Sequence, residues 1–334
     1  MIAVTGVTGD SQKDKPKIIA VTGATASGKS ALAVEIAEKL SGEIVSCDSM
    51  QIYRGMDIGT AKPTKEEMRK VPHHMINVCE PTDNYSAADF SDEASIKISE
   101  ITSRGHVPII CGGTGMYLDS LLRPTSFSEN STSDEDMYKI RRSLLEFAEQ
   151  NGAEALHARL REIDPYSAEN IHPNNIKRVA RAIEIYLTTG LTKTETDRMT
   201  REGSSPYDAL IINLDYADRK MLYSRIDRRV DIMMNSGLYN EVKSLYAREK
   251  LIAGTTAAQA IGYKEILSCL RGEISVDAAA ELIKKNSRNY AKRQITWFKR
   301  YDSLRLIPDK DGRVMSCEEL CGSIEPNLER FIKE

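Results

Sequence analysis

The sequence contains no run of about 20 apolar residues, no charged leader ahead of an apolar segment, and no C-x-x-C spacing among its six cysteines. The first absence argues against a membrane-spanning helix, and the second against a secretory signal. Without paired cysteines or a following histidine pair, a zinc site is not expected either. We therefore predict a cytoplasmic protein with reduced thiols and no membrane partner.

Net positive charge is also absent: the 334 residues carry a formal charge of −3, which alone argues against a nucleic-acid ligand. The distribution of charge argues otherwise. Residues 284–300 include seven Lys or Arg, three aromatic residues and no acid, and Lys177, Arg178 and Arg181 fall along one side of an expected helix. Solvated helix faces are the commoner explanation of such clusters, but the missing acids and interleaved aromatics favour a phosphodiester partner.

A phosphate-binding pattern, G-x-x-x-x-G-K-[ST], is present near the start of the chain. Its residues are Gly23, Ala24, Thr25, Ala26, Ser27, Gly28, Lys29 and Ser30. An apolar run at 18–22 predicts a buried strand before them, and 31–40 predicts a helix after them. In this order the loop N–H groups and the helix N-terminus face a phosphate, Lys29 reaches outer oxygens, and Ser30 reaches a Mg²⁺ cofactor. The pattern predicts binding of a di- or triphosphate.

The loop alone does not identify the phosphate or say whether it is cleaved. ATPases and kinases usually hold their metal with an acidic residue at the end of a second apolar strand. The strand expected at 107–111 ends in Gly112-Gly113-Thr114-Gly115, which contains no carboxylate. The other candidate, 210–215, ends in Asp215 but lies far along the chain. The usual second half of a nucleotide-cleaving site is missing or disguised.

Apolar strands separated by helical patterns are typical of a parallel sheet covered on both faces. Further strands are expected at 43–47, 75–78, 107–111, 209–214 and 304–307. Ser86 and Asp89 form a capping box at the start of a helix that ends at Gly105. We therefore predict an α/β fold, a P-loop NTPase-like parallel sheet with helices on both faces.

A change of character after Leu122 predicts a second domain. Residues 124–136 are polar and rich in turn formers, and 138–187 are helical in pattern with breaks at Gly152, Asp164-Pro165 and His172-Pro173. The stretch 189–206 is polar again. We predict a core formed by 17–123 and 207–310, an inserted all-helical domain at 124–206, and peripheral termini at 1–16 and 311–334.

Eight separated blocks agree in type and order with one known family. They are GATASGKS at 23–30, DSMQIYRGMDIGTAKP at 48–63, HHMIN at 73–77, YSAADF at 85–90, GGTGMYLDSLL at 112–122, HPNNIKRVARAIE at 172–184, AIGYKEI at 260–266 and AKRQITWF at 291–298. On these blocks the chain resembles the tRNA dimethylallyltransferases (isopentenyl-tRNA transferases). No zinc-finger block of the kind found in eukaryotic members follows, so the resemblance is to the shorter bacterial form.

The resemblance implies transfer of a dimethylallyl group from dimethylallyl diphosphate to the exocyclic amine of the adenosine 3′-adjacent to the anticodon. Diphosphate would leave intact, so the loop is needed to hold it, but a water-activating carboxylate is not. Arg219 matches the family's additional diphosphate-binding arginine. Asp48 is implied as the general base, although on its own it could equally be a turn carboxylate. Thr114 is implied to contact the reacting centre.

The resemblance also implies tRNA as the partner, recognised at its anticodon arm, with the adenosine flipped out of its stack. The residues implied to contact it are Asp48, Ser49, Met50, Gln51, Thr114, Arg141, Lys177, Arg178, Val179, Ala180, Arg181, Gln259, Gly262, Tyr263, Lys264, Lys292, Arg293, Gln294, Trp297 and Lys299. The inserted domain would hold the arm from one side. No obligate protein partner is implied.

Two other functions stay open on the residues themselves. An ATP-dependent P-loop kinase of small molecules or nucleosides would show lid arginines near the phosphate and a metal-binding carboxylate on the sheet. Arg178 and Arg181 could supply the first, but nothing clear supplies the second. A non-catalytic RNA-binding P-loop protein would leave Asp48 and Thr114 without a chemical role.

Overall fold

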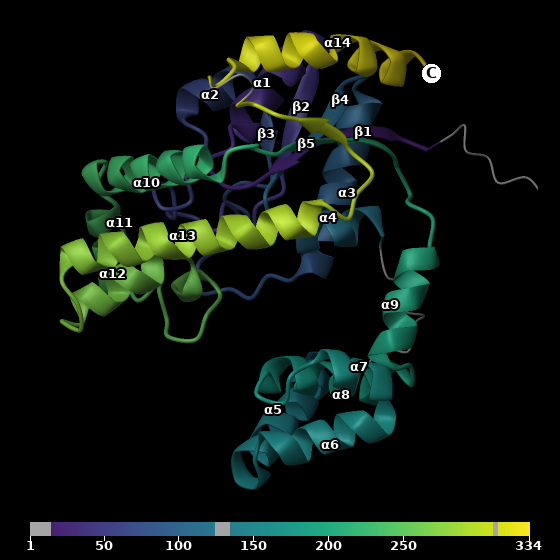
Figure 1. Ribbon diagram of the computed structural model, residues 1–334, viewed down its shortest axis with the longest axis vertical. Helices are drawn as coiled ribbons and strands as arrows, with labels where there is room; N and C mark the ends of the chain where they lie inside the picture. Colours follow the sequence, from purple (N-terminus) through teal and green to yellow (C-terminus); the bar gives the residue numbers. More distant parts are fainter. Residues whose placement is uncertain (1–14, 124–133, 310–312) are drawn as a thin grey trace, which may run out of the picture. The chain divides into compact units, whose positions relative to one another are not determined.

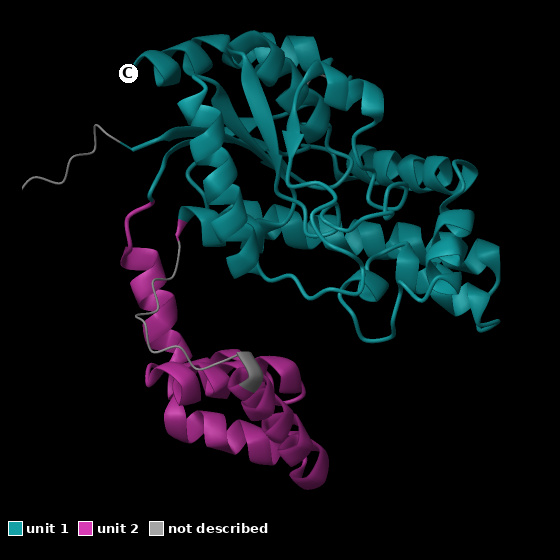
Figure 2. Cartoon of the chain, turned by 180° about the vertical axis from the view of Figure 1, so that it is seen from behind, with its two compact units in different colours: residues 1–122, 206–334 teal, residues 123–205 magenta. Residues whose placement is uncertain are grey.

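The computed structural model describes residues 15–123, 134–309 and 313–334 (Figure 1). The chain divides into two compact units, which are coloured separately in Figure 2. The larger unit combines Met1–Leu122 with Pro206–Glu334, and the helical unit is the single stretch Arg123–Ser205. The sequence places the insertion at 124–206, which divides the chain at nearly the same positions.

The larger unit is built on one six-stranded sheet whose paired strands are all parallel, as predicted. The strands are β1 (Lys17–Gly23), β2 (Gly42–Ser46), β3 (His73–His74), β4 (Val107–Gly112), β5 (Asp208–Leu214) and β6 (Leu304–Leu306). Their order across the sheet is β3-β2-β4-β1-β5-β6. β5 follows the insertion and pairs with β1 along its whole length, so the chain on both sides of the insertion shares one sheet.

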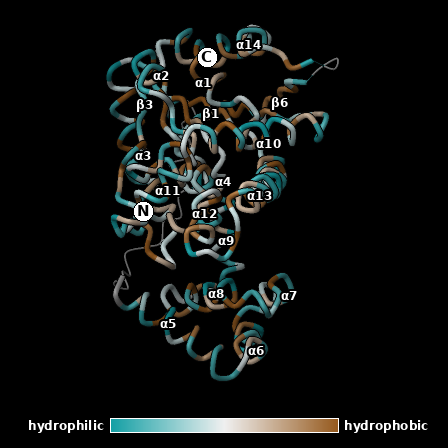
Figure 3. The backbone as a smooth tube through the Cα atoms, turned by 90° about the vertical axis from the view of Figure 1, so that its left-hand side faces the viewer, coloured by the Kyte–Doolittle hydropathy of each residue, from teal (hydrophilic) through white to brown (hydrophobic). Residues whose placement is uncertain are grey.

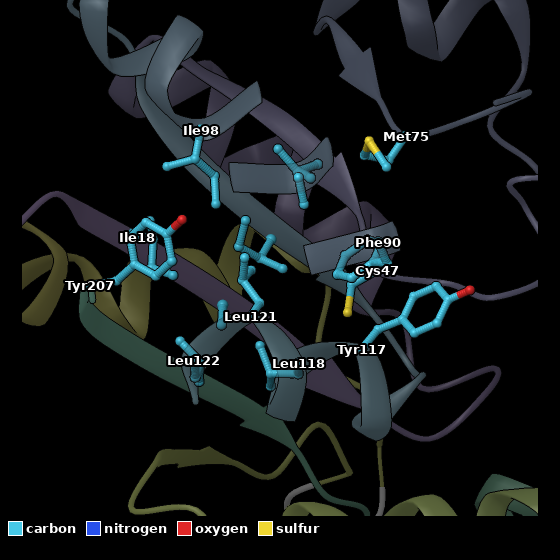
Figure 4. Packing of buried hydrophobic residues seen from close by; sticks show 14 of the residues in the cluster. Ile18, Cys47, Met75, Phe90, Ile98, Tyr117, Leu118, Leu121, Leu122 and Tyr207 are labelled. Atoms are coloured by element: carbon cyan, nitrogen blue, oxygen red, sulfur yellow. The ribbon is translucent and has the colours of Figure 1, made fainter. Parts of the chain in front are cut away.

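Successive residues of a strand point to opposite sides of the sheet, so a strand that is apolar throughout makes both faces apolar. Helices cover both faces of this sheet. Ile18 packs in an apolar cluster with α3 (Ala87–Ser103) and α4 (Gly115–Leu122), part of which Figure 4 shows. The next residue, Ile19, packs in another cluster with α1 (Lys29–Leu40) and α14 (Cys317–Lys333). The predicted capping box of Ser86 and Asp89 is present at the start of α3.

A third apolar cluster joins the loop after β2 to the helices that follow β5. These helices are α10 (Arg219–Asn235), α11 (Leu238–Ala247), α12 (Tyr263–Leu270) and α13 (Val276–Phe298), with a 3₁₀ turn at Ala257–Gln259. The remaining described helix of this unit, α2 (Lys65–Lys70), lies in the chain between β2 and β3. Ile52 and Tyr53 of the loop are fully buried in this cluster with Val242. The turns of α13 show both hydrophilic and hydrophobic colours in Figure 3. This cluster fixes the loop that carries Asp48 against α10 and α13.

The C-terminal segment corrects one prediction. Residues 311–334 were expected to be peripheral, but α14 lies against α1 (Figure 1) and buries Leu320, Cys321, Ile324 and Leu328 in the second cluster. These residues repeat at helical spacing, which the many charged neighbours obscure in the sequence. The helix therefore completes one face of the sheet.

The third strand is also shorter and earlier than predicted. It was expected at 75–78, but β3 consists of His73 and His74, which pair with Ile44 and Val45 of β2. Met75 (φ 60°) and Asn77 (φ 57°) adopt left-handed backbone angles. Such angles are incompatible with an extended strand, so the segment turns away from the sheet.

The helical unit contains α5 (Asp134–Asn151), α6 (Ala153–Ile163), α7 (Pro165–Asn170), α8 (Ile176–Thr189) and α9 (Lys193–Glu202). The breaks between the first four fall where Gly and Pro predict them, and Gly152 takes the positive φ of 89° that favours glycine. α9 begins at a Thr192–Glu195 capping box inside the stretch predicted only as polar. Leu156, Leu160 and Val179 lie in its apolar core. Across the described helices of the whole chain, none is long and apolar enough to cross a membrane.

Candidate active site

The phosphate loop joins β1 to α1 as its sequence pattern requires. β1 ends at Gly23 and α1 begins at Lys29. Ala26 (φ 61°) and Gly28 (φ 100°) adopt left-handed backbone angles that turn the chain between them. Gly23 leaves no room for a side chain, because a Cβ there would lie 2.9 Å from Leu214 O of β5. The loop thereby presents the unpaired first-turn N–H groups of α1 to its open side.

A cavity of ≈ 320 Å³ lies beside this loop, and all its lining residues belong to the larger unit. Part of its wall is apolar and includes Ile44, Met50, Val230, Met233 and Ile283. The charged lining consists of the cations Lys29, Arg229, Lys264 and Arg293 and the carboxylate of Asp48. With this apolar wall and these cations, the cavity suits an anion that carries a small apolar group.

Lys29 is a buried cation at this cavity, and Arg229 is a half-buried one. Lys29 is 8% exposed, and its Nζ donates a long bond of 3.4 Å to Ala24 O. Burial lowers the pKa of Lys29 and the Arg229 charge lowers it further, against opposing effects of Cys111 and Asp48. Burial also lowers the pKa of Arg229, against a smaller effect of Asp48. No described carboxylate forms a salt bridge with either side chain, so a bound anion would relieve the cost of burying both.

Asp48 lies directly after β2, at the carboxyl edge of the sheet where open α/β folds place their ligands. Its Oδ1 accepts a bond from Met50 N at 2.9 Å, and the residue lines the cavity. Thr114, which follows β4, braces the same turn: its Oγ1 accepts a bond from Ser49 N at 2.9 Å and donates to Ser49 Oγ at 3.2 Å. Thr114 does not line the cavity, and its bonds position the turn beside Asp48; its predicted contact with the reacting centre stays a prediction.

Tyr290 of α13 lines the cavity and was not singled out as a site residue by the sequence. Its hydroxyl donates to Gly113 O at 3.4 Å. Burial, followed by the negative charge of Asp48, raises the pKa of Tyr290 to about 12. The hydroxyl therefore stays protonated at neutral pH and keeps the proton that it donates to Gly113 O.

Gln51 also lines the cavity, but its amide has partners within the protein. Its Oε1 accepts a bond from Ser46 Oγ at 2.9 Å, and its Nε2 donates to Thr60 O and Ala61 O, both at 3.3 Å. These bonds close the loop that begins at Asp48. The proposed contact of Gln51 with a base edge stays a prediction.

Arg219 is the predicted diphosphate-binding arginine, and the structure places it beside Asp215. It is the first residue of α10 and lies 3.6 Å from Asp215 Oδ1, and it does not line the cavity. Two arginines farther along the same helix face the site instead. Arg225 Nε donates to Ala26 O at 3.0 Å, and Arg229, one turn later, lines the cavity. The helical spacing of Arg225 and Arg229 was the signal in the sequence that could have found them.

The predicted tRNA contacts in the larger unit differ in their exposure and in whether they line the cavity. Gln259, Gly262, Lys264, Arg293 and Gln294 line the cavity, while Lys292 on α13 and Lys299 just after it are exposed. Tyr263 is fully buried and donates to Glu241 Oε1 at 2.6 Å, and the amide of Gln294, 5% exposed, is bonded to the phosphate loop. Full burial of Tyr263 contradicts a side-chain contact with RNA, whereas Gln294 lines the cavity and its contact stays a prediction. Trp297 is half-buried against Gly115.

In the helical unit, the predicted tRNA contacts also divide into buried and exposed residues. Val179 and Ala180 are buried in the apolar core, which corrects their prediction as RNA contacts. Arg141 binds the buried Glu184 through two bonds of 2.8 and 2.7 Å, and Arg181 binds the same carboxylate. Burial opposes ionisation of Glu184, but the two arginines outweigh it and lower the pKa of this carboxyl. Lys177 and Arg178 are exposed on α8.

Metal-binding groups are sparse around the loop. The described residues contain no cluster of three His, Cys, Asp or Glu side chains that could hold a metal ion. Ser30, the predicted metal ligand, is an oxygen donor that lines the cavity, where Asp48 is the one carboxylate. This donor set fits Mg²⁺, which commonly keeps several waters and takes further oxygens from a bound phosphate. It offers no second acidic strand end of the kind that a kinase site uses.

Comparison with known proteins identifies the family. A family model described as IPP transferase matches residues 51–301. A tRNA dimethylallyltransferase from Caldanaerobacter subterraneus subsp. tengcongensis is 46% identical over 86% of this chain and 90% of its own. One from Staphylococcus haemolyticus is 47% identical over 86% and 85%, respectively.

Solved structures agree. The crystal structure of a tRNA isopentenylpyrophosphate transferase from Staphylococcus epidermidis matches with a TM-score of 0.68 and 42% identity, over 95% of this chain and 99% of that one. A eukaryotic dimethylallyltransferase described as acting on tRNA matches with a TM-score of 0.73 and 31% identity, over 84% and 69%, respectively. The chain therefore belongs to the IPP transferase family, that of the tRNA dimethylallyltransferases.

Proposed function

We propose that this protein transfers a dimethylallyl group from dimethylallyl diphosphate to the exocyclic amine of the adenosine 3′-adjacent to the anticodon of tRNA, releasing diphosphate. The observation that carries the proposal is the cavity beside the phosphate loop, where buried Lys29 and half-buried Arg229, which form no salt bridge with a described carboxylate, face an apolar wall and Asp48. A prenyl diphosphate has the matching parts, an anion and a short branched hydrocarbon.

Lys29, Arg229 and the first-turn N–H groups of α1 are the groups suited to hold the diphosphate. Cleavage of the carbon–oxygen bond builds negative charge on the bridging oxygen, and these donors are fixed before the reaction by burial and by the helix. Thr25 N and Ser27 N already bind Gln294 and Ala24, so they shape the loop instead of binding the phosphates. Electrostatic stabilisation of the leaving group is the main contribution we assign to the loop.

Asp48 is the group we assign to proton removal. An exocyclic aromatic amine is a weak nucleophile, and a carboxylate that accepts its proton as the new carbon–nitrogen bond forms makes the attack feasible. Asp48 lines the cavity and is fixed by Met50 N, while Thr114 fixes the following residue. A Mg²⁺ ion bound to diphosphate near Ser30 would neutralise part of the leaving-group charge.

The RNA partner in this proposal is the anticodon arm of tRNA. Lys177 and Arg178 of the helical unit, Lys292 of α13 and Lys299 just after it are exposed cations, suited to phosphate contacts. The cavity lies at the phosphate loop, so the adenosine must leave its stack to reach it. Shape and phosphate contacts would then supply most of the recognition.

A transfer assay tests the proposal. Full-length protein is incubated with Mg²⁺, an unmodified tRNA transcript and radiolabelled dimethylallyl diphosphate. We expect label on one adenosine beside the anticodon and one diphosphate released per transfer. Unlabelled tRNA with rapid, tRNA-independent ATP hydrolysis would instead favour a kinase or ATPase, and tRNA binding without transfer would favour a non-catalytic protein.

A further inference from the structure

Gln294 is a buried amide on α13 that contacts two catalytic loops at once. Its Oε1 accepts a bond from Thr25 N of the phosphate loop at 2.8 Å. Its Nε2 donates to Gly113 O, in the turn that precedes Thr114, at 2.9 Å. The side chain is 5% exposed. One residue therefore satisfies a donor in one loop and an acceptor in the other.

The bond between Gln294 and the second loop depends on a glycine at position 113. A Cβ on Gly113 would lie 2.2 Å from Gln294 Nε2, so glycine is needed for this close approach. Tyr290, one turn earlier on α13, also donates to Gly113 O, at 3.4 Å. The Gly113 turn leads directly into Thr114, which braces the backbone beside Asp48. The phosphate loop and the turn that carries Asp48 are therefore both positioned by α13.

We propose that Gln294 is a positioning residue that sets the phosphate loop and the Gly113 turn against α13, so that the anion site and the base are aligned by one side chain. The identities of the anion and base rest on the function proposed above. The same helix exposes Lys292, Lys299 just after it is also exposed, and Arg293 lines the cavity. A contact of RNA with α13 would therefore act on the helix that fixes the loop.

An amide is the side chain that this place requires. A carboxylate at position 294 could accept from Thr25 N, but its second oxygen would face Gly113 O without a proton between them. A protonated glutamic acid restores both bonds, because its O–H donates and its C=O accepts. A methionine of similar size supplies neither, and it leaves a buried donor and a buried acceptor unsatisfied.

Equilibrium binding of inorganic diphosphate, with Mg²⁺, to the full-length protein tests the proposal without requiring turnover. We expect Gln294→Met to weaken binding by about tenfold, the usual cost of a mispositioned or unsatisfied buried polar group. Gln294→Glu should be weaker still at pH 8, and its affinity relative to the unchanged protein should recover as pH falls and the buried carboxyl protonates. The other charged and titratable residues that line the cavity are the same in both proteins, so comparing affinities at each pH separates the effect of position 294 from theirs; they are Lys29, Asp48, His73, Cys111, Arg229, Lys264, Tyr290 and Arg293.

Asn286→Leu is the matched control, since Asn286 of α13 donates to Glu265 of α12 at 2.7 Å. It removes a side-chain bond of the same helix away from the loop, and it should bind diphosphate as the unchanged protein does. Amide exchange of the peptide containing Thr25 should accelerate in Gln294→Met but not in Asn286→Leu. If diphosphate binds the unchanged protein and Gln294→Met equally, the positioning role is wrong. If it does not bind the unchanged protein, the proposed function itself fails.

Discussion

In the larger unit, buried Lys29 and half-buried Arg229 lie beside a cavity, and no described carboxylate forms a salt bridge with them. In the helical unit, the side chains of Arg141 and Arg181 are 52% and 54% exposed, and both bind Glu184, which is fully buried. The first arrangement leaves positive charge uncompensated until an anion enters. The second is compensated inside the protein, so its geometry does not depend on a ligand.

The difference distinguishes cations suited to the chemical step from cations suited to tRNA binding. Cations that lack a salt-bridge partner in a desolvated position lower the stability of the empty protein, and they stabilise growing negative charge strongly because burial lowers the effective dielectric around them. Exposed cations interact through solvent, so each contributes little on its own and is weakened by salt. We therefore expect changes in the cavity to alter turnover steeply, and changes on the helical unit to alter tRNA affinity gradually.

The largest effect should come from Asp48, the carboxylate among the cavity cations. Asp48→Asn preserves the size and the bond from Met50 N but cannot accept the proton. Turnover should fall by about 10²–10⁴, the usual contribution of a positioned base, while tRNA affinity stays unchanged. Single-turnover kinetics with bound tRNA measures the chemical step. Wild-type turnover in this variant would show that the cavity carboxylate is only a turn residue.

The phosphate loop and the position of Asp48 at the sheet edge could be predicted from sequence for a physical reason, whereas the role of Asp48 as base was implied only by the family resemblance. The loop pattern combines a strand, a glycine turn and a helix start in consecutive residues, so local geometry decides its position. Asp48 directly follows a predicted strand, and parallel strands place their carboxyl ends at one edge. The breaks at Gly152 and Pro165 were likewise local, because each ends or begins a helix where it stands.

The parts that sequence could not supply depend on packing between distant elements. α10 carries arginines at 219, 225, 228 and 229, and only the packing of α10 against the loop decides that Arg229 lines the cavity. A glutamine in a basic run gives no sign that it is buried against Thr25. Val179 lies between basic neighbours in the sequence, and its helix face, not its neighbours, decides its burial.

The second comparison to test is the compensation of charge in the helical unit. The double variant Arg141→Leu/Arg181→Leu leaves Glu184 buried without its partners and should destabilise this unit by about 3–5 kcal/mol. Adding Glu184→Leu should restore most of that stability, because the apolar core around it can accept leucine. Hydrogen exchange of α8 measures the local free energy of opening. Equal exchange in the double and triple variants would contradict a buried charge as the cause.

The same carboxyl predicts a pH dependence. The pKa of Glu184 is lowered in the folded unit from an ordinary value of 4.5, so its contribution is fully present above that pH. It should be lost as pH falls below 4.5 and through the lowered pKa, because the unfolded state then binds the proton more readily. In the triple variant, protection of α8 should lose this acid dependence.

Arg229 offers a smaller and opposite effect. Arg229→Met should weaken diphosphate binding by about 10- to 100-fold, the value of a lost charge-assisted contact, and raise the melting temperature of the empty protein. The rise follows because burial lowers the pKa of Arg229, Asp48 offsets this only in part, and no described carboxylate forms a salt bridge with it. Arg219→Met is the matched control and should leave diphosphate affinity unchanged, since Arg219 lies beside Asp215. Titration calorimetry and thermal melting measure the two quantities. The reverse result would restore the assignment that the family resemblance implies.

The smallest effect should come from the exposed cations of α8. Lys177→Glu/Arg178→Glu should raise the KM for tRNA at moderate salt and leave that for dimethylallyl diphosphate unchanged, because both side chains are exposed and absent from the cavity lining. Each lost phosphate contact releases one counterion fewer, so the slope of log affinity against log salt should shrink by about 0.7–0.9 per contact. Arg142→Glu/Arg161→Glu changes the net charge of the same unit equally, at exposed positions on α5 and α6. If both pairs shifted the slope alike, general attraction would explain the effect; a shift confined to the α8 pair places phosphate contacts at Lys177 and Arg178.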